Sequence, residues 1–292
     1  MSNLALKPIY HQPQTAPPPS RSLPLPTMYD LPSDNPEDPG LPDQFHEYQP
    51  QLLSETFRPP RYPSKDICVA ADLNLYYDVD HPTWYKRPDW FAATGVPQFY
   101  EGHDLRMSYV IWQEKKVPFI VVELLSQSSE KEDLGKTPQD AEPPTKWQVY
   151  EHILRIPYYV LFSRDHKKFQ VFQMGGTRYR KIEPDDGRLW FLELNFGLGL
   201  WEGVYRDFRH RWLRWYDADG KWIPTAAERA KHEKQRADMG ELVVEQERQR
   251  ANLGELVAEQ ERLRANKGEQ IVEVEKQRAD QEFATPSVTF EI

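Results

Sequence analysis

The sequence has a single cysteine, Cys68, so the chain cannot form an internal disulfide. This usage fits a reducing compartment, and we expect a cytoplasmic protein. No apolar run approaches the roughly 18 residues of a membrane span, and the N-terminus lacks the charged-then-apolar pattern of a signal peptide, so we expect no membrane association. The eight histidines are scattered without His-x-His or His-Glu-x-x-His spacing, which argues against a zinc site.

Basic residues are also in the minority. The chain has 37 Lys and Arg against 46 Asp and Glu, a net charge of -9. This balance argues against strong non-specific binding of nucleic acid by the whole chain, although a locally basic cleft stays compatible with it.

Tryptophan and proline, in contrast, are concentrated in separate parts of the chain. All nine tryptophans lie between Trp84 and Trp222, which locates the folded domain, while fifteen of the 26 prolines lie in residues 1–63. We therefore predict a largely disordered Pro-rich segment over 1–63, a globular domain over 64–223, a helical tail over 224–282 and a disordered C-terminus over 283–292. Within the first segment, Gln44–Thr56 is compatible with either a docking helix or an unstructured tail.

Hydrophobic patterns in the middle part predict strands around one marked helix. Residues 67–78 alternate in polarity, which indicates one long strand with a buried face, and the segment around Asp89 is its expected hairpin partner. Further strands are predicted over 107–114, 117–125, 157–163, 168–174 and 177–183. The segment Lys146–Arg155 has apolar residues at helical spacing. Strands on both sides of a helix predict an α/β or α+β fold around a mixed sheet.

Glu123 is the most informative residue, because it lies inside the apolar strand 117–125. A buried carboxylate requires a compensating proton, metal ion or basic side chain. Asp89 follows Pro88 in a neighbouring strand-like segment, and Lys146 lies four residues before Tyr150 on the inward face of the helix. Two carboxylates and a lysine are the parts of a site that cleaves phosphodiesters with Mg²⁺, and Asp133 is a further candidate ligand.

Each of these residues also has a simpler structural explanation. Glu123 and Lys146 would form a buried ion pair without any catalytic role, Asp89 would be a hairpin turn residue, and Asp133 would be a solvated loop acid. The spacing of the four residues leaves both interpretations open.

The sequence motifs around these residues resemble those of the Uma-two family of restriction endonucleases, which is abundant in cyanobacteria. The resemblance rests on Arg87-Pro-Asp-Trp90, Val121-Val-Glu-Leu-Leu-Ser126, Asp133, Lys146-x-x-x-Tyr150 and Ile156-Pro-Tyr-Tyr159. It implies a PD-(D/E)xK nuclease-like mixed sheet flanked by helices, an active site of Asp89, Glu123 and Lys146, and a Mg²⁺ or Mn²⁺ cofactor. Leu125 stands where the wider nuclease pattern has lysine, so the lysine would come from the helix.

Two further segments give information on possible binding partners, which are nucleic acid and a second copy of the chain. Residues 206–215 combine Arg206, Arg209, Arg211 and Arg214 with aromatics, which suits contact with nucleic acid. An amphipathic edge strand with solvated arginines is the favoured explanation. In the tail, the triplet Gln-Arg-Ala or Leu-Arg-Ala recurs every fourteen residues, and apolar residues follow a seam of 3-4 spacing. We expect a long helix that forms a homodimer.

Two functions from different classes are compatible with the sequence. The first is a Mg²⁺-dependent hydrolase that cuts DNA as a restriction-type endonuclease. The second is a catalytically silent module with a nuclease-like fold that assembles through its helical tail. The retained Asp89, Glu123 and Lys146 favour the enzyme.

Overall fold

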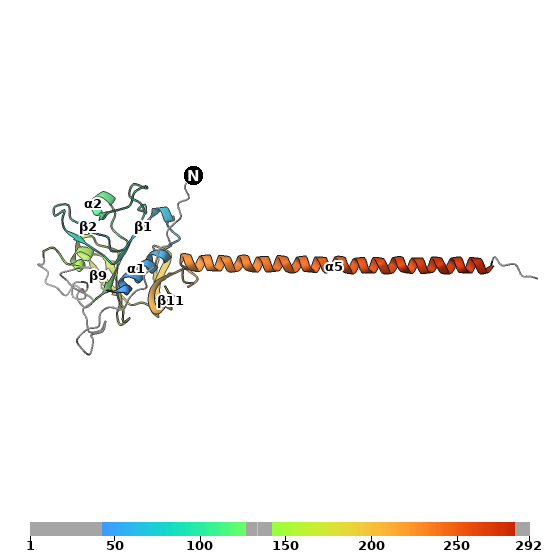
Figure 1. Cartoon of the computed structure of the whole chain (residues 1–292). Helices are drawn as coiled ribbons and strands as arrows, with labels where there is room; N and C mark the ends of the chain where they lie inside the picture. The colour runs from blue at the N-terminus through green and yellow to red at the C-terminus, as the bar shows by residue number, and fades with distance from the viewer. Residues whose placement is uncertain (1–42, 127–132, 134–141, 284–292) are drawn as a thin grey trace, which may run out of the picture. The chain divides into compact units, whose positions relative to one another are not determined.

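The computed structural model describes residues 43–126, 133 and 142–283, in two units that divide after Ile223. Of the segments 1–63 and 283–292, for which disorder is predicted, residues 1–42 and 284–292 lie outside the described part of the chain. Figure 1 shows the strands of the first unit and the long helix of the second. Each unit is described by itself below.

The first unit is built on a six-stranded mixed sheet. Its strands β6 and β7 are parallel and all other neighbours are antiparallel. In spatial order, the strands are β1 (Ile67–Ala70), β4 (Trp90–Thr94), β6 (Ile120–Leu125), β7 (Tyr158–Ser163), β8 (Phe169–Gly175) and β9 (Arg178–Ile182). Every residue of β6 and β7 is buried, as continuous apolar strands covered on both faces require.

Two smaller sheets and several helices complete the chain. One three-stranded sheet has the order β10 (Arg188–Phe191), β11 (Phe196–Tyr205), β12 (Phe208–Tyr216), and the other has the order β3 (Tyr85–Lys86), β2 (Leu75–Tyr76), β5 (Tyr109–Val110). The helical segments are α1 (Gln44–Thr56), the 3₁₀ turn η1 (Ser64–Asp66), α2 (Ile111–Glu114), α4 (Lys146–Gln148), the π-helix η2 (Val149–Ile153) and α5 (Ala226–Phe283).

The central sheet separates two hydrophobic cores. On one face, Trp90, Val122 and Phe162 pack in a cluster with residues of α1 and of the β10–β12 sheet. On the other face, Phe91 and Val121 pack with residues of η2 and of the small β2–β5 sheet. The predicted α+β fold around a mixed sheet is therefore confirmed, with a covering layer on each face.

Helix α1 belongs to the folded core, so the folded part of the chain begins before residue 64. Asp43 caps its N-terminus, and Leu52 and Leu53 are fully buried. The Gln49 amide both donates to the Leu213 carbonyl and accepts from the Leu213 N–H, each at 2.9 Å. The Gln49 side chain therefore makes the pair of hydrogen bonds with Leu213 of β12 that a residue of a neighbouring strand would otherwise make.

Two predicted strands differ from the observed ones. The alternation over 67–78 continues in the sequence, but Asp72 has a φ of 51°, which is incompatible with an extended strand. The segment therefore splits into β1 and β2, which lie in different sheets. The expected strand over 107–114 contains only β5, because the chain turns into α2 after Val110.

The predicted helix at Lys146 is present in a modified form. Thr145 begins it with a capping box, accepting from the Gln148 N–H while the Gln148 side chain accepts from the Thr145 N–H. After α4 the chain widens into η2, which changes the angular position of each following residue. Tyr150 is consequently buried as expected, whereas Ile153 is 45% exposed and does not face the core as predicted.

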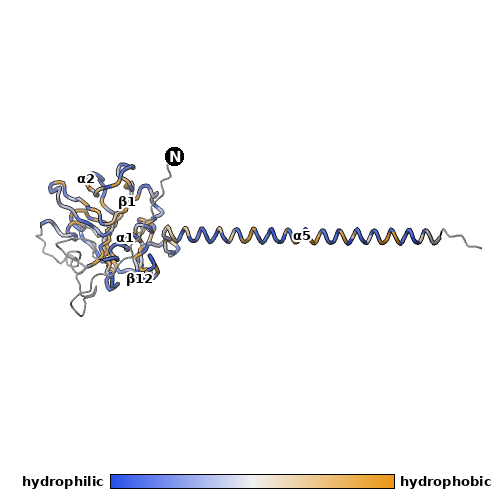
Figure 2. The backbone as a smooth tube through the Cα atoms, viewed as in Figure 1, coloured by the Kyte–Doolittle hydropathy of each residue, from blue (hydrophilic) through white to orange (hydrophobic). Residues whose placement is uncertain are grey.

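The second unit contains one continuous helix, α5, in agreement with the predicted helical tail. Thr225 and Glu228 form a reciprocal capping pair at its start. Figure 2 shows hydrophobic positions recurring along the otherwise largely hydrophilic α5. Across the described residues, none of the helices has the length and apolarity to span a bilayer.

Candidate active site

Glu123 and Asp89 lie opposite one another on adjacent strands. The register of β4 and β6 pairs Trp90 with Val122, and its continuation by one residue places Asp89 across from Glu123. Residues that face each other on antiparallel strands project from the same side of the sheet. The Asp89 N–H donates to Glu123 Oε2 at 3.4 Å, and Asp89 Oδ2 accepts from the Leu124 N–H at 2.6 Å.

Lys146 and Tyr150 reach the same carboxylate from the helical segment. Lys146 Nζ donates to Glu123 Oε2 at 2.9 Å, and the Tyr150 hydroxyl donates to Glu123 Oε1 at 2.9 Å. The two side chains are four residues apart, so the helix presents both to Glu123, which is fully buried. Glu123 is thus balanced by one cation and one neutral donor.

Asp133 joins this group and is not a solvated loop acid. It is fully buried, and its Oδ1 lies 3.4 Å from Lys146 Nζ. The Tyr159 hydroxyl donates to the Asp133 carbonyl at 3.1 Å and fixes the backbone there. The structure therefore gathers all four predicted residues, with Lys146 between two buried carboxylates.

The electrostatics of the group follow from its burial. Loss of hydration raises the pKa of Glu123 to about 7, with Lys146 opposing the rise and Asp89 adding to it. Burial likewise raises the pKa of Asp89, against the attraction of Lys146 and His46. For Lys146, burial acts to lower the pKa, but Glu123, Asp133 and Asp89 together hold it well above its usual value.

His46 is a neighbour of the site that the sequence analysis did not identify. Its Nδ1 lies 2.9 Å from Asp43 Oδ1 and its Nε2 lies 3.1 Å from the Leu124 carbonyl. Both partners only accept hydrogen bonds, so both ring nitrogens carry a proton and His46 is an imidazolium. Burial opposes this charge, yet Asp43 and Asp89 raise the pKa of His46. The Leu124 peptide is therefore held at its carbonyl by His46 and at its N–H by Asp89.

The arginine-rich segment lies on the β11–β12 hairpin, and its four arginines have different surroundings. Arg206 lies at the turn, with its guanidinium 5.3 Å from the centre of the Tyr48 ring. Arg214 is 3% exposed, donates to the Ile223 carbonyl and stacks 4.2 Å from the Trp201 ring centre. Arg214 therefore packs the hairpin and cannot reach a nucleic acid, contrary to the prediction.

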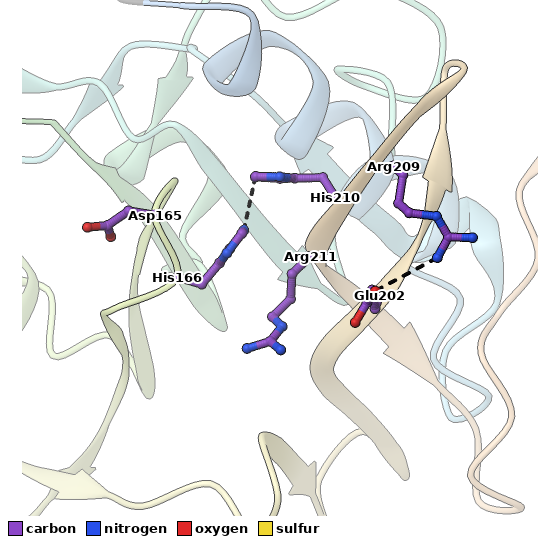
Figure 3. Close-up of a pocket in the computed structure, with 6 residues that line it drawn as sticks. All are labelled: Asp165, His166, Glu202, Arg209, His210 and Arg211. Carbon is purple, nitrogen blue, oxygen red and sulfur yellow. Dashed lines mark hydrogen bonds and ion pairs between the residues drawn. The ribbon is translucent and has the colours of Figure 1, made fainter.

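Arg209 and Arg211 instead line an open pocket of about 400 Å³. The remaining lining residues are Asp165, His166, Glu202 and His210. Figure 3 shows His166 and His210 directed toward one another, with their Nε2 atoms 3.0 Å apart. One ring must donate and the other accept, and burial lowers the pKa of both.

This pocket lies at the same edge of the central sheet as the carboxylates. Strands β6 and β7 run parallel with Leu125 beside Ser163, so Glu123 and the turn containing His166 both lie toward the carboxyl ends of these strands. Arg164 in that turn pairs with Asp43 at 3.0 Å, and Asp43 also holds His46. A series of polar contacts therefore runs from Arg164, in the turn beside the pocket, through Asp43 and His46 to the Leu124 peptide.

Metal-ligating side chains do not form a large cluster in the part of the chain that the structure describes. There, no three His, Cys, Asp or Glu side chains gather closely enough to hold a metal ion among themselves. Where protein ligands are few, Mg²⁺ completes its coordination shell with water and substrate oxygens.

Comparison with known proteins gives the family. A search of curated proteins finds no match. A sequence model of the Uma2 family, described as a putative restriction endonuclease, matches residues 23–205, which is more than half of the chain. The match spans α1, the central sheet and the group around Glu123, in agreement with the resemblance seen in the sequence. The chain belongs to the Uma2 family.

Proposed function

We propose that this protein is a Mg²⁺- or Mn²⁺-dependent endonuclease that hydrolyses phosphodiester bonds of DNA. The observation that carries the proposal is the group at Glu123: a fully buried carboxylate with Asp89 opposite it and Lys146 Nζ at 2.9 Å. A purely structural sheet has no need of a buried acid whose pKa is about 7.

The donor set fits a hard divalent cation. Asp89 and Glu123 present carboxylate oxygens from one face of the sheet, and Asp89 is only half-buried, which leaves a route to solvent. Mg²⁺ commonly binds one or two carboxylates and completes its octahedron with water and phosphate oxygens. In this proposal Asp89 and Glu123 are the ligands and Asp133 is a further candidate. The ion would polarise the phosphate and acidify the attacking water.

The protein side chains would supply the remaining steps of the hydrolysis, namely charge stabilisation and binding of the ion. Lys146 stays protonated because three carboxylates hold its pKa high, so it donates to the phosphate and balances charge on the pentacoordinate phosphorus. It therefore does not accept a proton. As a metal ligand Glu123 would stay ionised, so the attacking water would release its proton to solvent and the oxygen of the leaving strand would take a proton from solvent. The water oxygen bonds to phosphorus, and the phosphorus–oxygen bond to the leaving strand breaks.

We assign the pocket of Arg209, Arg211, His166 and His210 to the DNA backbone. Among the described residues the Arg211 guanidinium has no hydrogen-bond or ion-pair partner, and the Arg209 guanidinium has only a 3.8 Å pair with Glu202. Arg211→Gln should weaken DNA binding for all sequences and reduce the slope of log K against log salt by about 1. Lys181→Gln, on the far strand β9, is the matched control. An unchanged slope would remove this assignment.

The silent-module alternative is favoured by one specific feature. Both oxygens of Glu123 already accept hydrogen bonds from Lys146, Tyr150 and the Asp89 N–H. These donors occupy three of the about four acceptor positions of the carboxylate, and an ion would have to bind at the remaining one. If it does not, the group is a buried ion pair, and the chain serves assembly and not cleavage.

Thermal unfolding in the presence of Mn²⁺ separates the two functions without relying on activity. We expect Mn²⁺ to raise the melting temperature of the wild type and not of Glu123→Gln, because binding to the folded state alone stabilises it. Glu183→Gln, an exposed acid on the far side of the sheet, should respond like the wild type. DNA cleavage should require the ion and disappear in excess EDTA. Cleavage in EDTA, or full activity of Glu123→Gln, would refute the metal-dependent mechanism.

We further propose that α5 pairs two copies of the chain. One such site cuts one strand, so a double-strand break requires two sites. The full chain should sediment as a dimer, and a chain ending at Thr225 should sediment as a folded monomer. Equal masses per particle with and without α5 would exclude pairing through this helix.

A further inference from the structure

The charge pattern along α5 contains information on how two copies would pair. Assigning Met239 to heptad position a and Leu242 to position d places every apolar residue of the seam at a or d. These residues are between 52% and 64% exposed in the single chain, namely Met239, Leu242, Leu253, Leu256, Leu263 and Val274. The seam is therefore an unpartnered apolar face.

Acidic and basic residues flank this seam on opposite sides. Glutamates recur at position g, at Glu245, Glu259 and Glu273, and arginines recur at position e, at Arg250, Arg264 and Arg278. Among the described residues none of these six side chains forms an ion pair, and Glu245 and Glu273 accept hydrogen bonds from the neutral amides of Gln249 and Gln277. Their charges are thus available to a partner helix.

The spacing between the two sets matches one arrangement of helices. In a parallel, in-register pair, a g residue faces the e residue five positions later on the partner. Glu245 then meets Arg250, Glu259 meets Arg264 and Glu273 meets Arg278, each contact occurring twice by symmetry. In an antiparallel pair, g faces g and e faces e. No g position then has a basic partner, because all g residues from 238 to 280 are Asp, Glu or Asn.

The fourteen-residue repeat also restricts the register. A shift of one heptad would place Glu245 opposite Val257 and Gln246 opposite Leu253. This shift removes the ion pairs and sets amides against leucines. A shift of two heptads restores the matches but loses two heptads of overlap. Lys267 faces its own copy in the in-register pair and weakens it, as a polar a residue does.

We propose that α5 binds a second copy of this chain as a parallel, in-register coiled coil through these six charged residues and the apolar seam. This inference rests on the dimer proposed above and adds its orientation. In such a pair, the two chains enter the coiled coil at the same end. Because Glu123 precedes α5 in the sequence, both chains connect to their sites from the same end of the paired helices.

Disulfide formation between single cysteines tests the orientation directly in the full chain. Met239→Cys should cross-link to its own copy under mild oxidation, and so should Gln277→Cys, because in-register a or d pairs lie within disulfide reach. The natural Cys68 is buried and should not compete. In an antiparallel pair each new cysteine lies near the opposite end of the partner. A dimer in which neither variant cross-links would overturn the proposal.

Charge reversal tests the pattern itself. Replacing the three g glutamates by Arg should weaken dimerisation by at least about tenfold, because each attraction becomes a repulsion. Adding Arg→Glu at the three e positions in the same chain should restore it. The matched control reverses Glu241, Glu255 and Glu269, which have the same fourteen-residue spacing at outward c positions, and should leave dimerisation unchanged. Equal weakening by both sets, or no rescue, would refute the pairing. A monomeric wild type would instead refute the dimer while leaving nuclease activity to be judged by the Mn²⁺ and EDTA experiments.

Discussion

Replacing Glu123 by Gln should change how the stability of the folded domain depends on pH. The folded chain holds the proton of Glu123 with a pKa of about 7, against an ordinary value of 4.5. This contribution to stability is fully present below pH 4.5, where both states hold the proton. It is lost as the pH rises from 4.5 to about 7, because the unfolded state releases its proton over this range while the folded state still holds it.

The size of the effect follows from the shift. At about 1.4 kcal/mol per pKa unit, the shift from 4.5 to about 7 corresponds to about 3 kcal/mol of free energy of unfolding. Most of this, roughly 2.5 kcal/mol, should disappear between pH 5 and pH 8. His46, whose pKa is also raised, contributes in the same direction at the upper end. Asp43, with a pKa of about 2, acts only in more acidic solution and in the opposite direction.

Urea unfolding monitored by tryptophan fluorescence is suited to the measurement, since all nine tryptophans lie between Trp84 and Trp222. The difference in stability between pH 5 and pH 8 should be smaller in Glu123→Gln than in the wild type by roughly 2 kcal/mol. His46 and Asp43 are present in both proteins, so their contributions to the pH dependence cancel to first order in this comparison. Glu183→Gln, an exposed carboxyl, should keep the wild-type dependence. Identical pH dependence in wild type and Glu123→Gln would refute the reasoning.

Three further changes have expected outcomes of their own. Tyr150→Phe removes a donor from Glu123 and should destabilise the domain by about 1–3 kcal/mol in urea unfolding at pH 8, and by less at pH 5; a loss independent of pH would contradict this. His46 should show two ring N–H protons by NMR at pH 7, and His46→Gln should lower stability by about 2 kcal/mol because the Leu124 carbonyl loses a charged donor. A neutral His46 ring at that pH would count against the imidazolium. Gly254→Ala should stabilise α5 by about 1 kcal/mol, seen as a higher helical melting temperature by circular dichroism, since a Cβ there meets no atom within 4 Å.

The sequence predicted well those strands whose burial can be read from an uninterrupted run of apolar residues. The runs 117–125 and 157–163 are apolar without interruption, and both became fully buried central strands. The alternation of apolar and polar residues over 67–78 predicted one long strand, which is wrong. Such a pattern shows which side chains are apolar but gives no information on where the backbone turns. The positive φ of Asp72 ends β1 there, and aspartate tolerates this conformation without any distinctive spacing around it.

The site shows the same division between local and long-range information. Helical spacing placed Lys146 beside Tyr150 on one face, and both reach Glu123. His46 lies 78 residues from Leu124 in the chain, and no local pattern connects the two. The one available signal is the spacing of Asp43 and His46 across a helix start, which predicts a cap but gives no sign of its neighbour across the sheet.

The Gln49–Leu213 contact imposes an order on folding during synthesis. Helix α1 leaves the ribosome early, but the strand that receives its amide comes 164 residues later. At translation rates of 5–20 residues per second, this separation corresponds to a delay of roughly 10 to 30 s. Throughout that interval, the apolar face formed by Leu52 and Leu53 has no β12 to pack against. We expect the nascent chain to depend on a holding chaperone until β12 emerges, and the central sheet to close only once the hairpin is complete.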